Sequence, residues 1–390
     1  MKGLFKTYYI FLGFHSFLLG LFPFFLPVYL YKNGTSLVEI SFFVAFSGAG
    51  FVIALWCWDR LRGVHFLRTI IFSLLLELLL IFSIYLKVDL TIVALLNGGY
   101  NCLFWMIQRM LFFSSVSRQD SGRNFGNFQI FVMVVLKAGI FIGSVMLVNF
   151  GLIAICFLSL FIVCAAVLVF FSRSEQSLEV PAGLREQQSI GLSELVSFRD
   201  NCCSRLVFAV DGVFLYFESY FWLISLFLFV GESFIKLGMV VIILALFLGS
   251  LFLIIKNRID LVPVQKVYVV AVFLYALSWG MRGLISVDIP YSMQICLILS
   301  VAFCTSFFRL AFNKRFFDSA GLSTGYKYIF IKSYYSQFFL ACVFFLLAVI
   351  LRKFSESGEI IQFLYWGVAG FALLYLKYNP PGKDSGADKH

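Results

Sequence analysis

The chain has 390 residues, of which 62% are hydrophobic and only 13% are charged. Soluble domains are about half apolar and about a quarter charged, so this composition excludes a soluble globular protein. The net charge of +10 would suit nucleic-acid binding, but the basic residues lie between long apolar runs, as charges that orient a membrane protein do. We therefore expect a polytopic helical membrane protein that binds no nucleic acid.

Apolar runs long enough to cross the hydrocarbon core recur from one end of the chain to the other. They predict twelve transmembrane helices, at residues 5–30, 37–57, 69–86, 90–112, 126–148, 151–171, 204–229, 234–255, 265–285, 290–311, 329–350 and 359–377. The first run is too long for a secretory signal and lacks a small-residue cleavage site, so we expect it to be retained. Lysine and arginine concentrate in alternate connecting segments, and the positive-inside rule then places both termini in the cytoplasm.

The longest polar segment separates six predicted helices from six others. We expect an N-terminal six-helix bundle at 1–171, a cytoplasmic linker at 172–203, a C-terminal six-helix bundle at 204–377 and a disordered cytoplasmic tail at 378–390. The segments "FFSSVSRQDSGRNF" and "FFDSAGLSTGYKY", which follow the fourth and tenth helices, share a Phe-Phe-x-Ser start and a later Gly, basic residue and aromatic. This repeat indicates a duplicated six-helix unit, so the expected fold class is all-α with two pseudo-symmetric bundles.

A short motif follows the second predicted helix. The segment "LWCWDRLRGVHFLR" resembles the Gly-x3-Asp-Arg-x-Gly-Arg-Arg motif of the major facilitator superfamily. Asp59 and Arg60 match it, Arg62 is displaced, and Leu55 stands where the motif begins with Gly. A carboxylate such as Asp59 can accept hydrogen bonds from arginines or from a helix N-terminus, and can thereby lock one state of a transport cycle. The alternative is a loop charge that only sets topology.

Two further stretches carry the resemblance. On the fifth helix, "AGIFIGS" is similar to the Gly-Pro-x-x-Gly-Gly motif of antiporters, with Gly139 and Gly143 in place and Ile140 instead of Pro. The stretches "GFHSFLLGLFPFFLPVYLYKNG" and "NCLFWMIQRMLFF" resemble a proteobacterial branch that contains carboxylate-siderophore exporters. The resemblance implies a monomeric secondary transporter of the bacterial inner membrane, with gating residues Asp59, Arg60, Arg62, Gly139 and Gly143.

Polar side chains recur at helical spacing inside the predicted spans. One face of the fourth helix carries Asn97, Asn101, Trp105 and Gln108, with Arg109 beside them. The fifth helix carries a stripe with Lys137 at mid-span, and the eleventh carries Tyr328, Lys332 and Tyr335. We predict that the substrate is bound by Lys137, Arg109, Arg309, Asn101, Trp105, Gln108, Gln129 and Tyr335. The cations favour an anionic or zwitterionic substrate, although the arginines could instead extend to the membrane surface.

Carboxylates lie inside the seventh predicted helix. In "FAVDGVFLYFESYFWL", Asp211 and Glu218 are seven residues apart and therefore share a face. They are either a proton switch, which we favour, or permanent ion-pair partners of Lys137. His15 on the first helix is a third candidate for proton coupling, with a packing histidine as the alternative. For Glu77 on the third helix we expect a hydrogen bond between helices.

These observations predict a proton-coupled exporter of a small anionic or zwitterionic metabolite, such as a carboxylate siderophore. The chain contains no G-x4-G-K-[ST] loop, so we expect no ATP-driven step, and its scattered cysteines predict neither a metal nor a cofactor. One alternative is an exporter of amphipathic drugs or lipids, for which Lys137→Ala would leave transport intact. The other is a membrane enzyme or sensor, but His15, His65 and His390 are too scattered to suggest a catalytic cluster.

Overall fold

The computed structural model describes residues 2–61, 66–115, 121–172, 189–200, 202–259, 264–285, 289–322, 325–353 and 358–378. Within these ranges the chain is helical almost throughout and contains no strand. Twelve helical segments are long and apolar enough to span a membrane, which confirms the predicted fold class and number of spans. Helices are expected here because a lipid-exposed backbone must satisfy its own hydrogen bonds.

The helices follow one another as the apolar runs do. Those before the linker are α1 (Lys2–Leu21), η1 (Pro23–Phe25), α2 (Leu26–Lys32), α3 (Leu37–Leu61), α4 (Phe66–Tyr85), α5 (Leu90–Ser115), α6 (Ser121–Asn149) and α7 (Gly151–Phe171). The linker contains α9 (Leu192–Ser197). After it come α10 (Ser204–Tyr216), η4 (Phe217–Phe221), α11 (Trp222–Phe229), α12 (Phe234–Ile259), α13 (Val264–Leu284), α14 (Tyr291–Leu322), α15 (Gly325–Leu351), α16 (Gly358–Ala372) and η5 (Leu373–Lys377).

Two prolines interrupt the first span. Pro23 opens the short 3-10 turn η1, and Pro27 lies in the first turn of α2. Proline has no N–H to donate and its ring clashes with the preceding turn, so α1 cannot continue through Pro23. The span therefore consists of two helical pieces.

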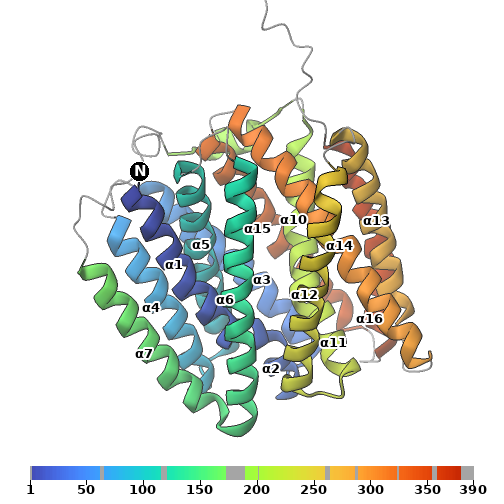
Figure 1. Ribbon diagram of the computed structural model, residues 1–390, viewed down its shortest axis with the longest axis horizontal. Coiled ribbons are helices and arrows are strands. Elements are labelled where there is room, and N and C mark those ends of the chain that lie inside the picture. The colour runs from blue at the N-terminus through green and yellow to red at the C-terminus, as the bar shows by residue number, and fades with distance from the viewer. Residues whose placement is uncertain are drawn as a thin grey trace, which may run out of the picture.

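The helices before and after the linker lie on different sides of the molecule. In Figure 1, α1, α4, α6 and α7 occupy one side and α13, α14 and α16 the other. Contacts between α3 and α15, and between α6 and α12, join these two halves. We call the end that carries the N-terminus and α9 the linker end, and the opposite end, where α6 turns into α7, the far end.

Glycines allow close approach of helices within and between the halves. A Cβ atom on Gly139 would overlap the carbonyl of Phe17, and one on Gly143 would overlap the carbonyl of Leu21. These two glycines therefore permit α6 to pack directly against α1, as small residues do in membrane bundles. Their predicted part in gating stays a prediction.

Candidate functional site

The membrane-spanning segment that contains Asp211 and Glu218 changes its helical winding between these two residues. Asp211 lies on the regular helix α10, whereas Glu218 lies in η4, a π-helical turn. A π turn holds one extra residue and shifts the side chains that follow it, and such turns are frequent at functional sites. The two carboxylates reach one cluster of cations and tyrosines, which we call the central charge cluster: Asp211, Glu218, Tyr275, Arg309, Lys332 and Tyr375.

Arg309 on α14 connects the two carboxylates. Its Nη1 donates to Asp211 Oδ1 at 2.7 Å. Its Nε donates to Glu218 Oε2 at 3.2 Å, and its Nη2 lies 3.1 Å from Glu218 Oε1. A planar guanidinium holds five N–H donors in a fixed fork, so it can donate to both carboxylates at once. Arg309 therefore does not extend to the membrane surface, because its side chain is held between α10 and η4.

The remaining members complete the partners of the acids. Lys332 Nζ on α15 lies 2.9 Å from Asp211 Oδ2, and the Tyr375 hydroxyl on η5 donates to Asp211 Oδ1 at 3.0 Å. Tyr275 on α13 donates to Glu218 Oε1 at 2.5 Å. The side chain of Asp211 is only 1% exposed and that of Glu218 is 16% exposed. Two carboxylates and two cations thus share one enclosed site with no net formal charge.

Further cations surround this neutral cluster. Arg109 on α5 donates from Nη1 to Ser333 Oγ on α15 at 3.1 Å. Ser333 directly follows Lys332 in the sequence. Arg282 on α13 is buried, with its guanidinium carbon 4.1 Å from the centre of the Trp279 ring. Neither guanidinium has a carboxylate within salt-bridge distance among the described residues. The site as a whole is therefore positive, which favours a ligand with negative charge.

Lys137 is not the partner of the acids. Its neighbours on the same face of α6, Ile140 and Ser144, lie against Gly238 of α12. Among the described residues its amine forms no hydrogen bond or ion pair. The interpretation that Asp211 or Glu218 is a fixed partner of Lys137 is therefore wrong in this structure, because Arg309 and Lys332 take that place.

The polar stripe on α5 reaches the second half of the molecule. Asn97 Nδ2 donates to Ser47 Oγ at 3.1 Å and to the Tyr220 hydroxyl at 3.3 Å, and Asn101 Nδ2 donates to the Asn97 carbonyl at 2.8 Å. Trp105 is 38% exposed, while Gln108 is buried. Because Tyr220 belongs to η4, Asn97 links the first half to the π turn that carries Glu218.

A second buried polar group lies within the first half. His15 Nδ1 on α1 lies 2.7 Å from Glu77 Oε2 on α4, and its Nε2 lies 2.8 Å from Ser73 Oγ. Aromatic rings of Phe11 and Phe104 enclose the imidazole. His15 thus contacts an acid on another helix. This contact fits both a proton carrier and a packing histidine, so its part in proton coupling stays a prediction.

The described part of the linker, residues 189–200, contacts both halves of the molecule at the linker end. On the first half, Ile190 N–H donates to Asp59 Oδ2 at 2.8 Å. On the second half, Tyr335 donates to the Leu195 carbonyl at 2.6 Å, and Lys327 pairs with Glu194. The buried carboxylate of Asp59 therefore holds the linker.

Four other predicted residues have different outcomes. The guanidinium of Arg60 stacks on Trp56, with its carbon 3.8 Å from the ring centre. Arg62 lies outside the described residues, and so does the side chain of Gln129, although its backbone belongs to α6. The Tyr335 hydroxyl donates to the Leu195 carbonyl of α9, so it can bind a ligand only when α9 moves away.

Three members of the central charge cluster are not identified by the sequence as partners of the acids. Lys332 belongs to a polar stripe, but the stripe does not mark it as the partner of Asp211, and no motif contains Tyr275 or Tyr375. The rule that charges inside a membrane pair with one another could have identified Lys332. Nothing in the sequence distinguishes the two tyrosines from the other sixteen of the 18 in the chain.

Solved structures share the fold over nearly the whole chain. A crystal structure of a mutant of the nucleoside transporter NupG matches with a TM-score of 0.69 and 12% identity, covering 96% of this chain and all of that one. A D-xylose-proton symporter matches with a TM-score of 0.66 and 12% identity, covering 97% of each chain. An auto-inhibited POT family peptide transporter matches with a TM-score of 0.62 and 13% identity, covering 99% of each. No family model and no curated protein matches the sequence.

Proposed function

We propose that this multi-pass membrane protein is a proton-coupled secondary transporter of a small anionic or zwitterionic metabolite. The observation that carries the proposal is the central charge cluster, two carboxylates and two cations enclosed by membrane-spanning helices, with Arg109 beside it. Ionisable residues are costly inside a membrane and usually serve ion or substrate pathways. The fold shared with transporters, one of them named as a proton symporter, supports this function over that of a membrane enzyme.

Substrate binding can be coupled to proton binding because Arg309 contacts both Asp211 and Glu218. A group that takes its guanidinium leaves Glu218 without its counter-charge, and a carboxylate in that situation gains affinity for a proton. A purely anionic substrate bound by Arg309 would therefore bind together with a proton. A cationic group on the substrate would instead compete with the proton for Glu218. Proton uptake would then release the substrate.

The direction of transport constrains the substrate. Competition of substrate and proton for one group couples export to proton entry, and in the central charge cluster a cation on the substrate provides that competition. We infer that an exported substrate is zwitterionic, with its amine toward Glu218 and its carboxylate toward Arg109. A carboxylate siderophore that also carries an amine fulfils this requirement.

Alternating access requires contacts at the two ends to break in turn. At the far end, Lys32 donates to the Glu232 carbonyl at 3.1 Å across the halves. At the linker end, α9 contacts Asp59 on one side and Tyr335 on the other. The positive-inside rule assigns the linker end to the cytoplasm, and we propose the bacterial inner membrane as the location and a monomer as the working unit.

The proposal is tested in proteoliposomes with an imposed pH gradient. Uptake and release of labelled amino acids, di- and tricarboxylates and carboxylate siderophores are measured for the unaltered chain, Glu218→Gln and Asp211→Asn. Glu232→Gln is the matched control, because it removes an exposed carboxylate at the far end and keeps the backbone carbonyl that accepts from Lys32. We expect Glu218→Gln to abolish the response to the pH gradient while substrate exchange persists. If both cluster variants retained full proton-coupled transport, the coupling assignment would be wrong.

One observation favours amphipathic cargo as a second candidate. Trp105 is 38% exposed, and Tyr216 and Tyr220 stack with ring centres 5.5 Å apart. These rings could hold an apolar body. Transport that is unchanged in Lys137→Ala and insensitive to Arg109→Gln would favour drugs or lipids as the cargo over a carboxylate.

A further inference from the structure

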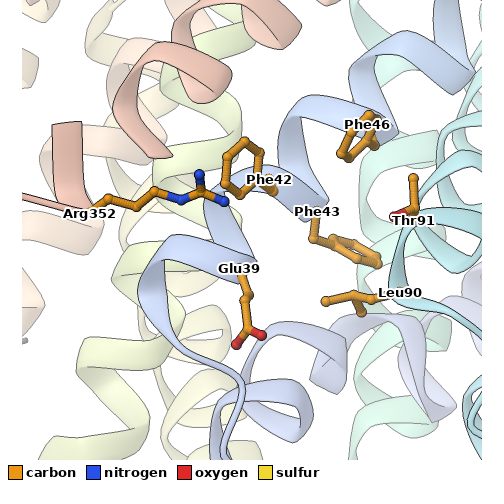
Figure 2. Close-up of a pocket in the computed structure, with 7 residues that line it drawn as sticks. All are labelled: Glu39, Phe42, Phe43, Phe46, Leu90, Thr91 and Arg352. Carbon is orange, nitrogen blue, oxygen red and sulfur yellow. The ribbon is translucent and has the colours of Figure 1, made fainter. Parts of the chain in front are cut away.

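A pocket opens at the far end, where the two halves meet. It has a volume of about 360 Å³ and is lined by Glu39, Phe42, Phe43, Phe46, Leu90, Thr91 and Arg352. In Figure 2, Arg352 extends toward Phe42 from one side, and Leu90 and Thr91 lie on the other. The first half contributes α3 and the start of α5, and the second half contributes the residue that follows α15. A ligand in this pocket would contact both halves.

The pocket faces the bilayer and not the interior of the molecule. Glu39, Phe42, Phe46 and Ile53 fall on one face of α3 by helical spacing, and Ile53 is 59% exposed. The opposite face, which includes Val44, is fully buried. Exposed apolar side chains continue from the pocket along the neighbouring helices, namely Ile92 and Leu95 on α5 and Phe345 and Leu346 on α15. These surfaces are suited to acyl chains.

Charges of opposite sign stand at the two sides of the pocket. The guanidinium carbon of Arg352 lies 4.8 Å from the centre of the Phe42 ring, and no carboxylate among the described residues pairs with it. Among the residues that the structure describes, Glu39 accepts hydrogen bonds at Oε2 alone, from the N–H and hydroxyl of Ser36, which leaves Oε1 for a ligand. Asp89 directly precedes Leu90, and hydrogen bonds from Thr91 hold the pKa of this carboxyl below its usual value. The first half therefore offers negative charge, and the second half offers positive charge.

We propose that this pocket binds the headgroup of a zwitterionic phospholipid that carries a primary amine. The phosphate contacts Arg352, the amine contacts Glu39, and the acyl chains lie along Phe46, Ile53 and Phe345. The pocket lies in the size range of sites for small molecules, about 300–1,000 Å³, so it holds the headgroup and leaves the chains in the bilayer. The site belongs to a lipid and does not depend on the transported substrate.

The test is native mass spectrometry of the purified full-length protein. The protein is exchanged into detergent that contains phosphatidylethanolamine, phosphatidylglycerol or phosphatidylcholine, and the lipid retained per chain is counted. We expect one tightly held phosphatidylethanolamine, and at least about tenfold weaker retention in Arg352→Gln and in Glu39→Gln, since each variant removes a charge-assisted hydrogen bond. Lys236→Gln, which removes an exposed cation at the far end on α12, is the matched control and should change nothing.

Two results would overturn the proposal. Equal retention of phosphatidylglycerol, with no effect of Glu39→Gln, would show a phosphate site without amine recognition. Retention that is unchanged in Arg352→Gln would show that the lipid binds elsewhere. Phe42→Ala provides a second variant, because it removes the ring beneath Arg352 and should also weaken retention. Lipid counts are measured without transport, so they do not depend on whether the proposed function is correct.

Discussion

Replacing Arg309 by Gln tests whether the central charge cluster stabilises the second half of the molecule. The change removes hydrogen bonds to Asp211, Glu218 and Tyr275 and leaves two enclosed carboxylates with one remaining cation. Removing one partner of a buried ion pair costs about 3–5 kcal/mol, because the other charge stays buried without compensation. Both sides of this pair are less than one-fifth exposed, at 17% for Arg309 and 16% for Glu218, so solvent screening is limited.

A surface pair in the same chain provides the control. Lys327 pairs with Glu194 at the linker end, where the side chains are 34% and 41% exposed. Exposed pairs contribute about 0–1 kcal/mol, so Lys327→Gln should lower the free energy of unfolding far less than Arg309→Gln does. Both variants lose one positive charge. Equilibrium unfolding in mixed detergent and SDS micelles measures the difference.

A double variant separates charge from packing. Arg309→Gln combined with Glu218→Gln removes one cation and one acid and leaves the contact between Asp211 and Lys332 intact. We expect the double variant to be more stable than Arg309→Gln alone by about 1–3 kcal/mol, because interacting residues are coupled by this order of energy. The reasoning is refuted if Arg309→Gln costs no more than Lys327→Gln, or if Glu218→Gln brings no recovery.

Two further predictions concern packing and the linker. Gly212→Ala places a methyl group against the backbone oxygen of Ser336, so it should separate α10 from α15 and lower the unfolding temperature, with an overpacking cost of about 1–3 kcal/mol. Gly280→Ala, where an added Cβ meets no atom within 4 Å, should leave that temperature unchanged, and equal effects of the two changes would contradict the argument. Asp59→Asn replaces a charged acceptor of the Ile190 N–H by a neutral one, so limited proteolysis should cut the linker several-fold faster; an unchanged cleavage rate would show that this contact does not hold the linker.

The partners of Asp211 and Glu218 cannot be predicted from the sequence. Helical spacing predicts that the two acids share a face, and both do reach one cluster. Several cations, however, lie at a similar depth in the membrane, and depth alone does not distinguish Lys137 from the observed partners. The choice among Lys137, Arg309 and Lys332 depends on which helices are neighbours and on the rotation of each helix. Neither quantity is contained in the hydropathy of a single helix.

The number of spans, the helical class and the stripes of polar residues follow from the sequence, because hydrocarbon accepts only long apolar segments with satisfied backbones. This constraint acts on each helix separately. The three-dimensional packing was needed to identify the ion pairs of the central charge cluster, the contacts of α9 with both halves and the pocket beside Arg352. Each of these joins residues that are far apart in the sequence, and only the packing of the helices brings such groups within hydrogen-bonding distance.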